Sequence, residues 1–175
     1  SEVPALGHSF VDEVCIVCGA AEGKFELVTD LAQITFGGEF VLVAKVGDAY
    51  LAMDTALANG KFVGTAVTVQ NDCIVGSKPV WDIEPVENGI AISCDGKYLA
   101  YASSTNFKLQ DNPYAWTVAD GYIINSATET RGIYYQISSG KFGVYANSNA
   151  TNSGYVSGLQ LYRYQAADCE HIFKD

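Results

Sequence analysis

One pattern recurs three times in this 175-residue chain: two apolar runs are joined by a short turn that contains glycine. The runs are 40–44 with 50–53, 89–93 with 97–101, and 132–136 with 141–145. The turns hold Gly47-Asp48, Asp95-Gly96 and Ser139-Gly140. Such pairs are typical of β-hairpins, because the turn needs a positive φ that glycine adopts without strain. The sequence therefore predicts three hairpins.

Further strand-like runs accompany the hairpins. They are Trp81-Asp82-Ile83, Trp116-Thr117-Val118 and Leu159-Gln160-Leu161-Tyr162. Three copies of roughly 45 residues in an all-β chain predict a β-trefoil-like closed barrel with three hairpin repeats. Because the spacing of the copies is uneven, a β-sandwich stays open as the alternative. A helix is expected only as a turn or two near 54–59.

The net charge of the chain and the length of its apolar runs limit the kinds of partner that it can bind. The chain has 10 basic and 20 acidic residues, which give a formal net charge of −10. Nucleic-acid binding requires a basic face, which so few lysines and arginines do not build. No run reaches the roughly 18 apolar residues that a membrane span needs, so we expect no membrane insertion. The sequence begins at Ser1 without an initiator methionine, so we expect that it is trimmed and that any secretion signal lies outside it.

The two ends differ from the middle. We expect a Cys/His boundary segment at 1–24, an all-β binding module at 25–165, and the start of a second boundary segment at 166–175. Cys-x-x-Cys-Gly is the spacing at which two thiolates reach one tetrahedral zinc. A structural zinc knuckle is one hypothesis, and free or disulfide-linked thiols and a redox pair are the others. The candidate ligands are His8, Cys15, Cys18, Cys169 and His171.

The ends also resemble a short repeat of secreted proteins from gut anaerobes, in which Cys-x-His-x-Phe is followed by Cys-x-x-Cys-Gly-Ala. In this chain the pattern falls on Leu6 to Ala20 and again on Cys169 to Phe173, with Leu6 in place of the leading cysteine. The resemblance implies one module of a larger multidomain surface chain, whose other domains are its partners. The motif is then a boundary element.

Few residues in the middle suit catalysis. No histidine lies between residues 9 and 170, so a nucleophile activated by histidine is excluded there. Carboxylates that glycoside hydrolysis could use are present, but their sequence context gives no pair. They are Asp82, Glu84, Asp95, Asp111 and Asp120. We therefore expect a protein that is not an enzyme.

Cys73 and Cys94 lie in strand-like runs, where buried free thiols are the expectation.

Several loops combine amide, carboxylate and tyrosine side chains. A flat ring stacks on a pyranose face, amides and carboxylates match its hydroxyls, and loops on a rigid β-scaffold are common binding sites. Ordinary polar turns are the alternative, and core packing is the expected role of both tryptophans. The carbohydrate-binding candidates are Tyr101, Asn106, Asp111, Asn112, Tyr114, Trp116, Tyr145, Asn147, Asn149 and Tyr155.

Two further resemblances point the same way. Trp116 to Ile123 and Gly96 to Leu99 look like the repeats of ricin-type trefoil lectins, although Pro79 and Tyr114 stand where those repeats carry glutamine. The stretch 25–164 is similar to an accessory module of gut-bacterial surface proteins, through Arg131-Gly-Ile-Tyr-Tyr and related marks. Such modules accompany glycan-degrading and starch-adherence systems.

These resemblances imply an extracellular or cell-surface carbohydrate-binding module whose partner is a polysaccharide or oligosaccharide, with α-glucan such as starch favoured. A structural spacer or protein-interaction module without a glycan ligand is the alternative. A groove lined with tyrosines favours the first, and a flat apolar patch favours the second.

Overall fold

The computed structural model of the protein describes residues 10–11, 14–15 and 23–166, and it confirms the all-β prediction. Phe10–Val11 (β1) and Val14–Cys15 (β2) form a two-stranded antiparallel pair. The remaining strands belong to one large sheet. They are β3 (Lys24–Leu27), β4 (Gly38–Val46), β5 (Ala49–Met53), β6 (Phe62–Ala66), β7 (Thr68–Gln70), β8 (Cys73–Val75), β9 (Trp81–Val86), β10 (Gly89–Cys94), β11 (Lys97–Ser103), β12 (Asn106–Gln110), β13 (Trp116–Ala119), β14 (Ile123–Ser126), β15 (Arg131–Gln136), β16 (Lys141–Ala146), β17 (Tyr155–Val156) and β18 (Gln160–Gln165).

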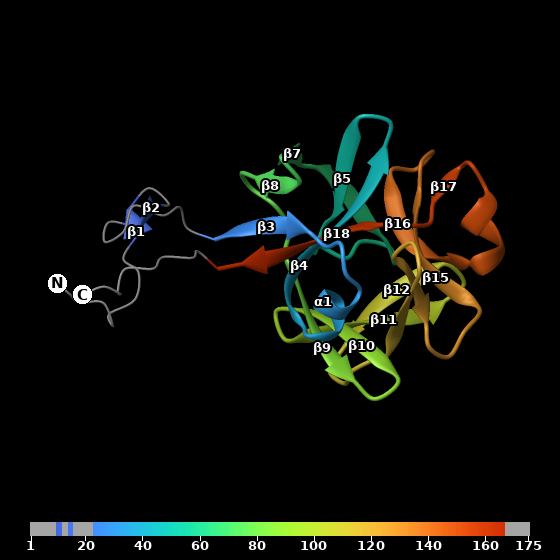
Figure 1. Ribbon diagram of the computed structural model, residues 1–175. Coiled ribbons are helices and arrows are strands. Elements are labelled where there is room, and N and C mark those ends of the chain that lie inside the picture. The colour runs from blue at the N-terminus through green and yellow to red at the C-terminus, as the bar shows by residue number, and fades with distance from the viewer. Residues whose placement is uncertain (1–9, 12–13, 16–22, 167–175) are drawn as a thin grey trace.

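All three predicted hairpins are present as β4–β5, β10–β11 and β15–β16. The turn at Asp95-Gly96 contains two residues of positive φ, at 54° and 79°, as a two-residue hairpin turn of this twist requires. Figure 1 shows the β4–β5 turn at the top, β15 to β17 at the right and the β9–β10 turn at the bottom, arranged around a common centre.

The strand pairing closes into a ring. Starting from β4, each strand pairs with the next through β9, β10, β13, β14, β15, β16, β6 and β5, and β5 returns to β4. Closure removes the open edges that the sheets of a sandwich would leave. The structure therefore has the closed barrel with three hairpins that was expected first.

The core fills this ring with side chains from all three repeats. Phe62 packs edge-on against Trp81 at 5.2 Å between ring centroids, and Phe107 lies 5.0 Å from Phe62 and 6.3 Å from Trp116. Both tryptophans are fully buried. The expectation that they pack in the core is confirmed, and aromatic packing of this kind ties neighbouring repeats together.

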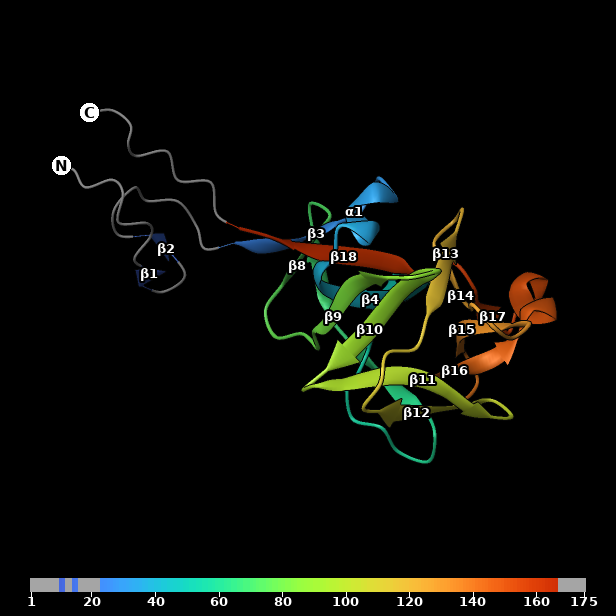
Figure 2. The same ribbon diagram turned by 90° about the horizontal axis from the view of Figure 1, so that it is seen from below.

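The helix lies elsewhere than expected. Residues 54–59 form a loop, because the Asp54 carboxylate accepts hydrogen bonds from the Thr55 amide at 2.6 Å and from the Thr65 hydroxyl at 2.9 Å. The helical turn is instead α1 (Ala32–Thr35). A 3₁₀ helix, η2 (Asn147–Thr151), follows β16. Figure 2 places α1 and the turn between β13 and β14 at the same end of the barrel.

Candidate functional site

The predicted binding residues do not form one site. The structure distributes them among the loop 126–131, the surroundings of η2, the two ends of β12, and the core. In the first of these places one loop contacts two predicted aromatic residues, Tyr101 and Tyr114, and both are partly exposed. We call this group the tyrosine surface, and it consists of Tyr101, Tyr114, Thr128 and Arg131.

The loop 126–131 contacts both tyrosines of the tyrosine surface. The hydroxyl of Tyr114 lies 2.6 Å from Ser126 Oγ and 3.3 Å from Thr128 Oγ1. At the other end of the loop, the Arg131 guanidinium lies 5.9 Å from the centroid of the Tyr101 ring. Both residues are half-buried, and both pack against the core.

Serine at position 126 shapes this loop. Its buried hydroxyl accepts hydrogen bonds from the amides of Thr128 and Glu129, each at 3.1 Å. A serine side chain that bonds to the following backbone fixes a local turn. The amide of Ala127 also donates to the carbonyl of Ala115 at 3.1 Å, which fastens the loop to the segment before β13. The tyrosine surface is therefore pre-organised.

Arg131 is held in place from two sides. Its Nη1 donates to the carbonyl of Val144 at 3.2 Å, and its guanidinium lies over Tyr101, whose hydroxyl donates to the Ser104 carbonyl at 3.1 Å. A guanidinium over a ring face is attracted by the π electrons of the ring. Sequence reasoning did not place Arg131, Ser126 or Thr128 in the site, because their contacts join segments far apart in the chain.

Trp116 is not a surface platform. Its exposed fraction is 0%, its indole Nε1 donates to the carbonyl of Leu99 at 3.0 Å, and its ring packs 5.1 Å from that of Tyr114. Trp116 was a sugar-stacking candidate only on the condition that it was exposed, and this condition is not met; core packing accounts for the residue. Tyr114 covers it on the side of the loop 126–131.

Tyr145 is also buried, with an exposed fraction of 6%. Its ring lies against Gly143, where an added Cβ would come within 2.8 Å of Tyr145 Cε2, and its centroid is 4.9 Å from that of Tyr155. Burial raises the pKa of the Tyr145 hydroxyl. The carbohydrate-binding candidate Tyr145 is therefore not an exposed stacking platform, because Gly143 leaves room for its ring to pack against the sheet.

The polar residues around Tyr145 form hydrogen bonds with one another. Tyr134 donates to Asn147 Oδ1 at 3.0 Å, and Gln136 Nε2 donates to the Tyr155 hydroxyl at 3.1 Å. Asn149 accepts a bond from Asn152 Nδ2 at 3.3 Å within the η2 region. These contacts hold η2 and β17 against the β15–β16 hairpin. Asn147, Asn149 and Tyr155, which are carbohydrate-binding candidates, thus each make a hydrogen bond within the fold.

The remaining candidates lie at the two ends of β12. Exposed Asp111 pairs with Lys97, which lowers the pKa of the Asp111 carboxyl, and Asn112 offers its backbone carbonyl to Gln110 at 2.9 Å. At the other end, Lys61 donates to Asn106 Oδ1 at 2.6 Å. None of these three candidates contacts the tyrosine surface through a hydrogen bond that the structure shows.

The zinc hypothesis falls outside the described structure. His8, Cys18, Cys169 and His171 lie outside the described residues, and of Cys15 only the backbone strand is described. Among the residues that the structure describes, no group of three or more metal-ligating side chains gathers. Cys73 and Cys94 carry free, half-buried thiols, and burial raises the pKa of each.

A pocket that the sequence did not predict opens beside α1. It has a volume of about 140 Å³ and lies between α1 and the paired strands β10 and β13. Its lining is mainly apolar and includes no carboxylate. The lining residues are Leu31, Ile34, Thr35, Gly89, Ile90, Trp116, Thr117 and Val118.

No known protein family, curated protein or solved structure matches the chain. Within the described part of the chain, no helix has both the length and the apolarity to cross a membrane. The geometry of the tyrosine surface and of the pocket beside α1 therefore carries what can be inferred about function.

Proposed function

We propose that this protein is a non-catalytic carbohydrate-binding module of a secreted or cell-surface bacterial protein, with an α-glucan such as starch as the favoured polysaccharide. The observation that carries the proposal is the tyrosine surface. Two half-buried rings, Tyr101 and Tyr114, lie at the two ends of one fixed loop, and Arg131 holds hydrogen-bond donors beside them.

The chemistry of this surface suits a sugar. The exposed part of a tyrosine ring stacks on the apolar face of a pyranose, while guanidinium and hydroxyl groups bond to the sugar hydroxyls. Thr128, Glu129 and Thr130 are exposed on the same loop and add polar groups beside the rings. Because these groups exchange bonds with water, we expect an affinity in the micromolar to millimolar range, about 4 to 8 kcal/mol.

The pocket beside α1 has no carboxylate in its lining, so it lacks the pair of acids that glycoside hydrolysis requires. Glycoside hydrolysis uses two carboxyl groups that face each other across the substrate. Asp82 lies on β9 opposite Glu39, and Glu84 accepts a bond from the Tyr98 hydroxyl at 3.0 Å, which raises the pKa of Tyr98. Neither Asp82 nor Glu84 lines the pocket beside α1.

Native affinity electrophoresis tests the proposal, using gels that contain starch, glycogen, pullulan, xylan, β-glucan, galactan or mucin. We expect retardation in the α-glucan gels, and we expect Tyr101→Ala to weaken binding about tenfold, as the loss of about 1.4 kcal/mol of stacking would. Tyr50→Ala is the matched control, because Tyr50 is also half-buried and Lys45 Nζ lies 5.3 Å from its ring centroid.

Two results would contradict the proposal. One is migration that no gel retards, together with no heat of binding from maltooligosaccharides in calorimetry. The other is retardation that Tyr101→Ala and Tyr50→Ala reduce equally, which would place any binding outside the tyrosine surface. Retardation by galactan or xylan alone would keep the binding role and replace the α-glucan.

A second candidate function has an observation of its own. Phe36, at the end of α1, has an exposed fraction of 73%, the largest among the exposed large apolar residues that the structure describes. Its exposed ring offers apolar area that a protein partner would cover. The protein-interaction alternative therefore rests on α1 and its surroundings.

A further inference from the structure

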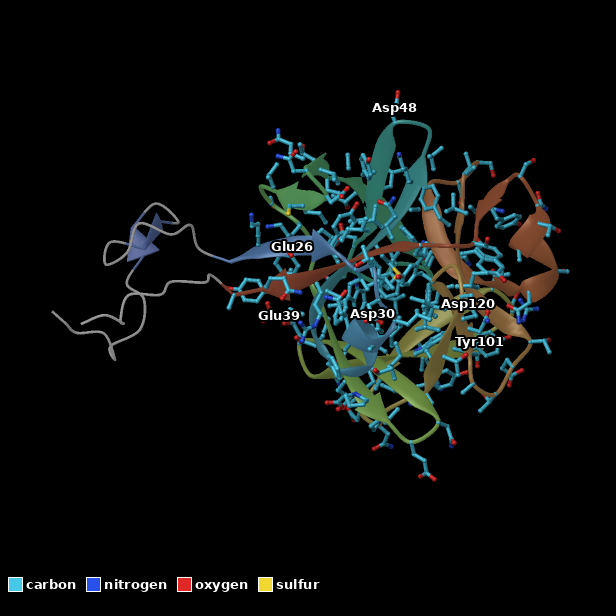
Figure 3. The ribbon with its side chains drawn as sticks, viewed as in Figure 1. Glu26, Asp30, Glu39, Asp48, Tyr101 and Asp120 are labelled. Carbon is cyan, nitrogen blue, oxygen red and sulfur yellow. The ribbon has the colours of Figure 1, made fainter. Side chains whose placement is uncertain are left out.

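The chain contains two Asn-Gly pairs, Asn59-Gly60 and Asn88-Gly89. Both asparagines are exposed, and both have a positive φ, 52° at Asn59 and 72° at Asn88. Turn positions of this kind face water: Figure 3 shows Asp48, at the tip of the β4–β5 turn, pointing away from the barrel. Asparagine is thermally labile, because the backbone nitrogen of the next residue can attack its side-chain amide carbon. A following glycine leaves that approach open, since it has no Cβ.

Asn59-Gly60 forms the whole of a two-residue turn. The flanking residues Ala58 and Lys61 exchange two backbone hydrogen bonds, each 3.0 Å long. The φ angles of 52° and 78° are both positive, as the type I′ turn that Asn-Gly favours requires. The Gly60 carbonyl accepts a bond from the Phe107 amide at 2.8 Å, but the Gly60 amide donates to no group in the described part of the chain. The nitrogen that follows Asn59 is therefore free.

Gly89 is instead held in the sheet. It pairs with Val86 across the β9–β10 turn, so it closes that turn and does not lie inside it. The pair that closes a two-residue turn exchanges both backbone hydrogen bonds. On its other side, an added Cβ would lie 2.1 Å from the carbonyl oxygen of Trp116 on β13. The nitrogen that follows Asn88 is thus engaged as a donor and enclosed between two strands.

We infer that Asn59 is a site of spontaneous deamidation and that the fold protects Asn88 from the same reaction. At Asn59 the Gly60 amide gives up its proton to hydroxide, and the nitrogen forms a bond to Asn59 Cγ. The Cγ–Nδ2 bond breaks, and the leaving group takes a proton from water and departs as ammonia, which leaves a five-membered succinimide ring. Water then opens the ring at either of its carbonyl carbons. The product is aspartate or isoaspartate, and water is the only co-reactant.

The position of the first turn connects this reaction to the barrel. Figure 2 shows the loop 54–61 beside β12. An added Cβ at Gly60 would lie 2.5 Å from Asn106 Oδ1, the atom that also accepts a bond from Lys61 at 2.6 Å. Aspartate keeps the backbone of the turn unchanged, so the fold should accommodate it. Isoaspartate adds one carbon to the backbone path of a turn that is packed closely on Asn106, so it should weaken the contact with β12.

Incubation of the full chain at mildly alkaline pH tests the inference. Samples are digested under mildly acidic conditions, the mass increase from amide to acid is quantified at Asn59 and Asn88, and an isoaspartyl methyltransferase labels the isoaspartate. We expect Asn59 to react at least about fivefold faster than Asn88 in the folded chain, since breaking one net hydrogen bond costs roughly that factor. In urea the two rates should agree within about twofold, because unfolding removes the protection at Gly89.

A double variant tests the role of the free amide directly. Glu87→Asn combined with Asn88→Gly moves the Asn-Gly pair of the second turn into its two turn positions, which is the arrangement of Asn59-Gly60. The asparagine introduced at position 87 should then react within about threefold of Asn59, because the amide that follows it no longer belongs to the closing pair. Asn59→Asp is the control for the assignment at the first turn: it should fold normally and lose the fast release of ammonia.

Several outcomes would overturn the inference. Equal rates at Asn59 and Asn88 in the folded chain would show that the hydrogen bond of Gly89 gives no protection. A rate difference that persists in urea would assign it to the neighbouring sequence, and a slow reaction at position 87 in the double variant would show that a free amide is not sufficient. None of these results bears on glycan binding, since no residue of either turn belongs to the tyrosine surface.

Discussion

The indole Nε1 of Trp116 donates a hydrogen bond to the backbone carbonyl of Leu99 over 3.0 Å in the core. Trp81 makes the same bond to the carbonyl of Met53, also at 3.0 Å. In both cases the acceptor lies on the second strand of a hairpin, and the tryptophan begins a later strand of the ring. Each bond therefore fastens a hairpin to the barrel at a point where the carbonyl has no access to water.

Replacing Trp116 by phenylalanine should destabilise the fold strongly. Trp116→Phe removes the donor, leaves the buried Leu99 carbonyl unpaired and opens a cavity, and we expect a loss of about 2 to 4 kcal/mol in the free energy of unfolding. Urea unfolding followed by circular dichroism measures it. Trp81→Phe should lose a similar amount because it makes the equivalent bond, and a loss below about 0.5 kcal/mol in either variant would contradict this account.

Any side chain at position 89 should lower the free energy of unfolding. Gly89 has a φ of +155°, and an added Cβ would lie 2.1 Å from the carbonyl oxygen of Trp116, where β10 pairs with β13. Backbone at that position has to move, so Gly89→Ala should cost at least about 3 kcal/mol and break the ring at this pairing.

Gly96→Ala provides the matched control for Gly89→Ala. Gly96 also has a positive φ, +79°, but open space surrounds its missing Cβ. Only backbone strain remains, so we expect a loss of about 1 to 2 kcal/mol. Equal losses in the two variants, measured by thermal unfolding, would show that the contact with Trp116 carries no energy.

The local part of the fold was predictable. Each hairpin was visible in the sequence because the strands, the turn and their pairing lie within about 15 residues. The loop 54–59 and α1 were not, since an Asp54 side chain that bonds to Thr65 and a helical turn of four residues leave little local pattern. Closure of the ring also depends on pairs such as β4 with β9, whose contacts come from distant segments.

A difference in hairpin turns explains why Tyr98 and Phe142, which have similar sequence contexts, lie in different environments. Tyr98 and Phe142 follow similar Gly-Lys pairs, which predicts that both lie in the core. Lys97 pairs with Cys94 across a two-residue turn, whereas Lys141 pairs with Gln136 across a four-residue turn. Because the two turns differ, Phe142 points into the core, while Tyr98 lies on the outer face and bonds to Glu84. A sequence match over three residues did not reveal that shift.

The candidate site was predicted only in its residue types. Tyr114 is a candidate because it stands in a polar loop and Tyr101 because it ends a strand-like run, and the structure joins them through the loop 126–131. The partner Arg131 lies 30 positions from Tyr101 in the chain, and the pocket beside α1 combines three distant segments. Periodicity and turn signals carry no information about such contacts.

The thiols of Cys73 and Cys94 should react slowly. Burial raises the pKa of both, and Asp95 raises that of Cys94 further, so little of either thiol is ionised at neutral pH. Alkylation by iodoacetamide, quantified for each peptide by mass spectrometry, should therefore be several-fold slower at both residues than in free glutathione. Denaturation in urea should remove the difference. Equal rates before and after unfolding would contradict the effect of burial.

Alkaline pH should destabilise the fold through Tyr162. This residue is buried, with an exposed fraction of 1%, and its hydroxyl donates to Gln160 Oε1 at 2.6 Å. Burial is the first cause that raises the pKa of Tyr162 to about 12 from an ordinary value of 10.0. Below pH 10 the phenol is neutral in both folded and unfolded chains, so its full contribution to stability is present. Between about pH 10 and 12 it ionises only in the unfolded chain, and that contribution is lost.

Tyr162→Phe isolates this effect. At about pH 8 the variant should be less stable than the unchanged chain, because it lacks the bond to Gln160. As the pH rises toward 12 the difference should shrink or reverse by on the order of 2 kcal/mol, since phenylalanine does not ionise. Urea unfolding at about pH 8, 10 and 11 measures it. Buried Tyr134, Tyr135 and Tyr145 also have raised pKa values and remain in both proteins, so they cancel in the comparison. A difference that stays constant with pH would show that Tyr162 ionises as readily in the folded chain as in the unfolded one.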